Sequence, residues 1–218
     1  MEIHVLPSGP IQTIGYLLTE SKLSEAVLID APGDIIAKIK PLLARDGCKL
    51  TELWLTHGHW DHIQESARVK REFGVKVLAH LADRDFIEAP EKMEEFMGAR
   101  LGLEPTAVDQ WIGQGDLLRA LGHDFEVRHV PGHCPGNILF YLAAQKTAWV
   151  GDALFKGGVG RWDFPGGDFD LLASSIRRQI YTLPDDTIVY PGHGPFTTVG
   201  EEKRTNPYIS GTGPLSFE

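Results

Sequence analysis

The chain has 218 residues, of which 42% are hydrophobic, and its formal net charge at pH 7 is −9. These values are typical of a soluble globular protein, and we expect residues 1–218 to form a single domain with a short C-terminal tail. The acidic balance argues against nucleic acid as a partner, because phosphate binding needs clustered Lys and Arg. The opening MEIHVLPSGP lacks the regions of a signal peptide, and no stretch is apolar enough to span a bilayer, so we expect a cytoplasmic protein without a membrane partner.

The first half of the sequence predicts strands and helices in alternation. Short apolar runs indicate strands at residues 3–6, 13–19, 25–30, 52–56 and 75–80. A helix is predicted from Asp34, which is expected to cap it, and Pro41 is expected to kink or shorten this helix. A second helix is predicted over residues 63–73, and residues 81–104 are expected to be helical and polar, with residues 91–102 as one short helix.

The second half is richer in strands. Strands are predicted at residues 125–130, 138–143, 147–152 and 187–192, and one helix is predicted from Phe169 to Tyr181. The strands come in runs with helices between the runs. This order favours a two-sheet core covered by helices over a strictly alternating parallel sheet.

The segment THGHWDHI, residues 56–63, carries four metal-binding side chains directly after a predicted strand: His57, His59, Asp61 and His62. Alternate side chains of an extended loop lie on the same side, so several of them can reach one point. Histidine is the commonest ligand of transition metals near neutral pH, and carboxylate joins it readily. The segment therefore predicts a metal site.

Three further ligand-type residues follow later strands. His133 lies in PGHCPG, Asp152 follows TAWVG, and His193 lies in PGHGP. Glycine allows sharp turns, and loops carried by rigid strands are the usual place for functional sites. Taken singly, each would be interpreted as a solvated or hydrogen-bonded side chain, as His4, His80, His123 and His129 are. Together the seven residues exceed the four ligands of one tetrahedral Zn²⁺ and suit two metal ions.

The segments LTHGHWDHI, HVPGHCPGN, VGDALFKGGVGRWDFPGGD and VYPGHGP carry a resemblance to the metallo-β-lactamase superfamily. More narrowly, the chain is similar to the small glyoxalase II-like hydrolases, the hydroxyacylglutathione hydrolase group. The resemblance implies an αββα four-layer sandwich. It also implies that His57, His59 and His133 bind a first metal, that Asp61, His62 and His193 bind a second, and that Asp152 bridges them.

The same resemblance implies a thioesterase that uses a hydroxide shared by two divalent metals, with Zn²⁺ foremost and iron or manganese as alternatives. Asp61 and Asp152 are then the catalytic carboxylates. Arg161, in the GGVGRWD loop, is expected to hold an anionic, possibly glutathione-linked, small-molecule thioester. Trp60 is expected either to form a wall of the substrate pocket or to pack under the loop. The oligomeric state is left open.

Three other functions stay open at this point. A persulfide dioxygenase would bind one Fe(II) through His57, His133 and Asp152. A lactonase would present another carbonyl to the same hydroxide, and a non-catalytic metal-binding module would need a closed set of four ligands. The longer enzymes of the glyoxalase II group carry a helical C-terminal domain, whereas this chain ends soon after EEKRTNPYI. Cys134 and Asn137 stand where the group often has Thr and Ser, which bears on the substrate and not on the ligands.

Overall fold

The computed structural model describes residues 1–209, so the end of the chain, where a short tail is expected, lies outside the described residues. A first sheet has six strands in the order β1-β2-β3-β4-β5-β6. The first three strands are antiparallel, and β3 to β6 are parallel. Their bounds are β1 Glu2–Ser8, β2 Thr13–Glu20, β3 Glu25–Ile29, β4 Lys49–Trp54, β5 Lys76–Ala79 and β6 Gln110–Trp111.

A second sheet of six strands has the order β14-β13-β10-β9-β8-β7. Its pairs are antiparallel except for β10 with β13, which are parallel. A separate ribbon pairs β11 (Leu154–Phe155) with β12 (Gly158–Val159). The strands of the sheet are β7 Leu117–Ala120, β8 His123–His129, β9 Ile138–Leu142, β10 Thr147–Gly151, β13 Ile188–Pro191 and β14 Thr197–Thr198.

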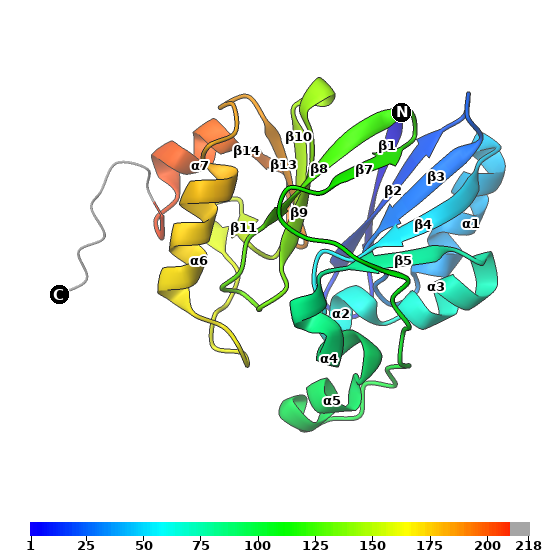
Figure 1. Cartoon of the computed structure of the whole chain (residues 1–218), viewed down its shortest axis with the longest axis horizontal. Helices are drawn as coiled ribbons and strands as arrows, with labels where there is room; N and C mark the ends of the chain where they lie inside the picture. Colours follow the sequence, from blue (N-terminus) through cyan, green and yellow to red (C-terminus); the bar gives the residue numbers. More distant parts are fainter. Residues whose placement is uncertain (210–218) are drawn as a thin grey trace.

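Helices cover the outer face of each sheet, which gives the predicted αββα sandwich (Figure 1). Helices α1 (Ile35–Asp46) and α3 (Ser66–Phe73) pack on the first sheet, and α6 (Phe169–Ser175), its π-helical continuation η3 (Ile176–Ile180) and α7 (Val199–Thr205) pack on the second. The remaining helices are α2 Trp60–Ile63, η1 Leu81–Asp83, α4 Arg84–Glu88, α5 Glu91–Met97 and η2 Ala143–Gln145. Within residues 1–209, every helix is too short or too polar to cross a membrane.

The side chains of the central strands alternate between two cores. In β9, Phe140 packs between the sheets and its neighbours Leu139 and Tyr141 pack under the outer helices. In β3, Val27 and Ile29 face the other sheet. Strands buried on both faces read as continuous apolar runs, which is why ILFYL and EAVLI are prominent in the sequence.

Several predicted boundaries were wrong. The helix expected over residues 63–73 begins at Ser66 as α3, and Ile63 is the last residue of the separate short helix α2. Between them, the Ser66 hydroxyl donates to the carbonyl of Ile63 at 2.6 Å. Asp34 adopts φ 65° and its side chain does not cap α1; instead the Glu65 carboxylate accepts the N–H of Ile36 at 2.9 Å. Pro41 does not shorten α1, which continues to Asp46.

The polar segment after β5 also differs from the prediction. The single helix expected over residues 91–102 ends at Met97, where Gly98 takes a positive φ of 62°. The sequence reading did not identify β6, β7, β11, β12, β14 or α7. Strands of two residues, such as β6, β11, β12 and β14, are too short to show a period.

We expect Phe140→Ala to lower the free energy of unfolding by about 3–5 kcal/mol, because it opens a cavity between the sheets. The Phe140 ring lies 5.0 Å from that of Trp54, centroid to centroid, and is fully buried. Urea denaturation measures the change. Leu117→Ala, at a side chain that is 70% exposed, is the control and should change the free energy by less than about 0.5 kcal/mol. Equal losses in both variants would contradict the two-sheet core.

Candidate metal centre

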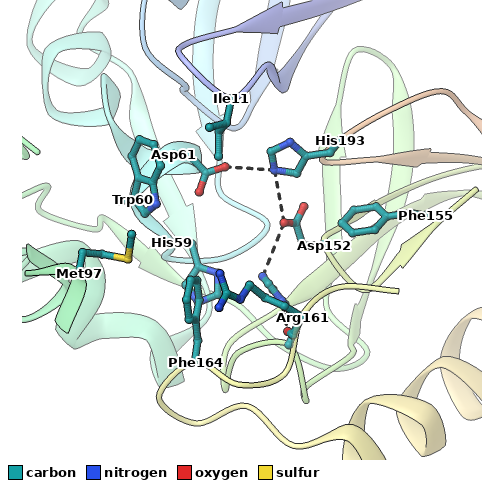
Figure 2. A pocket seen from close by; sticks show the side chains of 11 residues that line it. Ile11, His59, Trp60, Asp61, Met97, Asp152, Phe155, Arg161, Phe164 and His193 are labelled. Atoms are coloured by element: carbon teal, nitrogen blue, oxygen red, sulfur yellow. Dashed lines mark hydrogen bonds and ion pairs between the residues drawn. The ribbon is translucent and has the colours of Figure 1, made fainter. Parts of the chain in front are cut away.

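All seven predicted ligands converge at one end of the two sheets, on the segments that follow four strands. Figure 2 shows four of them, His59, Asp61, Asp152 and His193, around the pocket. The first sheet supplies four of them after β4, and the second sheet supplies one after each of β8, β10 and β13. Loops on rigid strands hold side chains in fixed positions, so residues far apart in the sequence meet. The seven are His57, His59, Asp61, His62, His133, Asp152 and His193.

Ligand atoms within this cluster form overlapping groups of three that lie within 4.8 Å of one another. One group is His57, His59 and His133, and another is Asp61, His62 and His193. Asp152 lies between the two groups: its carboxylate is 3.3 Å from His62 Nε2, 3.7 Å from His133 Nε2 and 3.5 Å from His193 Nε2. Two of these groups have the same members as the two metal sites that the family resemblance implies, and a third group, His57, His62 and Asp152, joins them.

The imidazole rings turn their unused nitrogens toward one another. The buried Nε2 atoms of His57, His59, His62 and His133 make no hydrogen bond to the residues that the structure describes. On His62 and His133 the other nitrogen is held, since Nδ1 lies 2.8 Å from an Asp30 oxygen and 2.7 Å from the Arg161 carbonyl respectively. These oxygens accept, so Nδ1 carries a proton on each ring and Nε2 faces the cluster. Orphaned buried nitrogens of this kind fit metal ions.

The charges in the cluster also favour a cation. Burial lowers the pKa of His57, and it lowers that of His59 to about 3, so both rings are neutral near pH 7. Burial opposes protonation of His62 too, but Asp61, Asp152 and Asp30 outweigh it and raise its pKa. A metal ion that binds there displaces this proton, because a ligating imidazole must be neutral. The donor set of imidazoles and carboxylates suits zinc, iron or manganese.

Asp30, directly after β3, positions residues of the cluster through hydrogen bonds. Its carboxylate accepts the N–H and the hydroxyl of Thr56, both at 2.7 Å, and binds the His62 ring. The Thr56 hydroxyl in turn lies 3.0 Å from His57 Nδ1. One fully buried carboxylate therefore orients a histidine of each group.

Asp83, in η1, connects the two loops that carry the group of three histidines. Its carboxylate accepts the N–H of Gly58 at 2.8 Å, the N–H of Gly136 at 2.6 Å and the thiol of Cys134 at 3.2 Å. Burial raises the pKa of Asp83, and these donors oppose that rise. A Cβ atom at Gly136 would lie 2.4 Å from Asp83 Cγ, so glycine is needed for the approach.

Cys134 itself is fully buried, and burial raises the pKa of its thiol well above the usual range. Reactive cysteines have lowered pKa values and are accessible. The thiol therefore acts as a buried hydrogen-bond donor to Asp83, which fits the structural role better than a redox role.

The cluster lies at the floor of an open pocket of about 360 Å³. Both predicted substrate contacts, Trp60 and Arg161, line this pocket (Figure 2). Trp60 thus lies at the pocket wall and not beneath the loop. The Arg161 guanidinium pairs with both carboxylate oxygens of Asp163, at 2.7 and 2.8 Å.

The sequence reading missed the supporting residues Thr13, Asp30 and Asp83. The hydroxyl of Thr13 donates to Asp61 at 2.6 Å from a different strand. Asp30 had one visible signal, an aspartate that ends the apolar run EAVLI. Asp83 had none, because it is one of several charged residues in a polar segment.

We expect Asp83→Asn to weaken binding of one metal ion about 10–100-fold, because an amide cannot accept hydrogen bonds on both sides. Metal content after desalting should fall from about two Zn²⁺ per chain to about one, since Asp83 contacts only the loops of the three-histidine group. Cys134→Ser, which keeps a donor toward Asp83, is the matched control and should retain both ions. Two tightly bound ions in Asp83→Asn would contradict the role of Asp83.

Several known proteins are similar to this chain in sequence and in structure. The family model described as the metallo-beta-lactamase superfamily matches residues 11–193. Hydroxyacylglutathione hydrolase GloC of Haemophilus influenzae is 38% identical over 213 residues, which cover 96% of this chain and 99% of that protein.

Two solved structures are similar over nearly the whole chain. The B3 metallo-beta-lactamase BLEG-1 is 36% identical with a TM-score of 0.88, and the match covers 97% of this chain and 100% of that one. The protein TTHA1623, in a di-iron-bound form, is 36% identical with a TM-score of 0.82, and the match covers 94% and 100%. The chain belongs to the metallo-β-lactamase superfamily.

Proposed function

We propose that the chain is a metal-dependent thioesterase of the hydroxyacylglutathione hydrolase type. The observation that carries the proposal is the pair of adjoining ligand groups, with four unsatisfied buried nitrogens, at the floor of an open pocket. The similarity to GloC over nearly the whole chain supports the reaction class.

His57, His59 and His133 would hold one divalent ion, and Asp61, His62 and His193 would hold the other, with Asp152 between them. When bound, two such metal ions activate water near neutral pH and polarise the carbonyl of the substrate. Zinc, iron and manganese all suit the donor set. The di-iron-bound form of TTHA1623 supports iron as an alternative to zinc.

The residues of the chain would fix the geometry of the reaction. The Thr13 hydroxyl donates to one oxygen of Asp61 at 2.6 Å, which limits the rotation of this carboxylate. Asp30 and the Arg161 carbonyl fix two of the imidazole rings. In the reaction the carbonyl carbon gains the oxygen of water and the carbon–sulfur bond breaks. The products are a carboxylate and a thiol, and one proton is released to solvent.

The side chains of the pocket favour a thioester over a lactone or a lactam. A thiolate leaves without prior protonation, because its conjugate acid has a pKa near about 8.5. An alkoxide or an amine is a poorer leaving group and gains more from a general acid. Among the described residues that line the pocket, every ionisable group except Arg161 belongs to the seven-residue cluster, which leaves no separate acid.

We expect protein reconstituted with Zn²⁺, Fe²⁺ or Mn²⁺ to release glutathione from S-lactoylglutathione, with the released thiol measured colorimetrically. A chelator should abolish the release. Asp152→Asn should lower kcat/KM by at least about 100-fold, because a charge between the two ligand groups is lost.

Asp186→Asn is the matched control, since Asp186 is an exposed carboxylate that pairs with Lys146. It should keep full activity and full metal content. If metal-loaded protein released no thiol with any of the three ions, the proposal would be wrong.

A persulfide dioxygenase is the second candidate function. A two-histidine, one-carboxylate set is present, since the His57 and His133 rings lie 4.9 Å apart and His133 Nε2 is 3.7 Å from Asp152. The second ligand group would then have no function, so we expect iron-loaded protein to consume no oxygen with glutathione persulfide. Oxygen uptake in an electrode, with sulfite as the product, would favour the dioxygenase.

A further inference from the structure

The pocket around the metal centre has an apolar wall. Five of the lining side chains are apolar: Ile11, Trp60, Met97, Phe155 and Phe164. Trp60, Met97 and Phe164 lie on the His59 side of the pocket, and Phe155 lies on the side of Asp152 and His193 (Figure 2). The reacting carbonyl would therefore lie between apolar surfaces.

Phe164 is the best fixed part of this wall. Its ring lies 5.1 Å from the His59 ring and 5.3 Å from the Phe96 ring, and both contacts are edge-to-face. The Arg161 guanidinium carbon lies 3.9 Å from the ring centroid. Contacts with three separate side chains hold Phe164 beside a ligand of the metal centre, so the part of its ring that lines the pocket can act as a preformed apolar contact.

The opening of the pocket is apolar as well. Ile11 is 50% exposed and Met97 is 36% exposed, and both line the pocket. Large apolar side chains gathered at a pocket mouth mark a surface that a ligand can cover. Helix α5 supplies Met97, so this helix forms part of the rim.

A charged substrate group finds little to bind inside the pocket. Arg161 is the one Lys or Arg among the described lining residues, and Asp163 pairs with it through both oxygens. The Arg161 guanidinium also stacks on the Phe164 ring, so Arg161 helps to hold the apolar wall in place. Selectivity in this pocket therefore comes from apolar contact more than from charge.

We infer that the pocket selects thioesters whose acyl group carries a bulky apolar side chain, of about the size of a phenyl ring, over the lactoyl group. This inference rests on the proposed thioesterase function. Each methylene that enters an apolar pocket can change kcat/KM by about tenfold, so a phenyl group in place of a methyl group gives a measurable difference.

The test compares S-mandeloylglutathione with S-lactoylglutathione on the metal-loaded protein. The two substrates share the carrier and the α-hydroxyl group, and they differ only in phenyl against methyl. We expect kcat/KM to be about tenfold or more higher for the mandeloyl substrate. Phe164→Ala should lower the mandeloyl-to-lactoyl ratio by about tenfold.

Two further variants make the result specific. Met97→Ala changes a different part of the wall and should also lower the ratio, which covers the case in which Phe164→Ala disturbs His59 and loses metal. Phe196→Ala removes an aromatic ring that is 60% exposed and does not line the pocket, so its ratio should equal that of the unaltered protein.

The outcomes separate the two claims. Equal kcat/KM values for both substrates in the unaltered protein would overturn the inference and leave the thioesterase intact. A preference that survives both Phe164→Ala and Met97→Ala would also overturn it. Release of thiol from neither substrate would overturn the proposed function itself.

Discussion

The rest of the site depends on the hydrogen bonds that the buried carboxylate of Asp30 accepts. It accepts two hydrogen bonds from Thr56 and one from the His62 ring. The carbonyl of Thr56 accepts the N–H of Ile138, the first residue of β9, at 2.9 Å. A continuous chain of hydrogen bonds thus runs from the first sheet, through the metal loop, into the second sheet. A buried carboxylate is stable only when such partners satisfy it.

Backbone contacts complete the connection at the same end of the sandwich. The N–H of Ile14 donates to the carbonyl of Gly192 at 2.8 Å, and the Tyr16 hydroxyl donates to the carbonyl of Pro191 at 2.5 Å. Gly192 must be glycine, because a Cβ atom there would lie 2.0 Å from an Asp152 oxygen. The loop that carries His193 is therefore positioned by the opposite sheet, and the close approach of the carboxylate follows from the glycine.

The clustering of the seven candidate ligands could be predicted from the sequence because each lies in a short motif directly after an apolar run. Their supports could not, since Asp30 reaches His62 across 32 positions and Asp83 reaches Gly136 across 53. The family resemblance supplied the αββα arrangement, whereas the strand pattern alone favoured only two sheets with helices outside.

Errors in the prediction have specific physical causes. Asp34 is a residue type that often caps helices. Here the carboxylate of Glu65, which lies between α2 and α3, accepts the N–H of Ile36 instead. Helix α2, which begins at Trp60, is only four residues long. Its start is set by the metal loop and is not marked by an apolar period. Local propensity decides such details weakly when a tertiary contact competes with it.

The ligands come from both sheets, so an ion bound in the cluster fastens one half of the sandwich to the other. Binding to the folded chain alone stabilises it by about 4 kcal/mol for each ion whose free concentration is a thousandfold above its Kd. This is a large share of the stability of a typical domain. The lifetime of the protein in a cell would then depend on the supply of metal. Without metal the protein would lose its activity and would also be degraded faster by proteases.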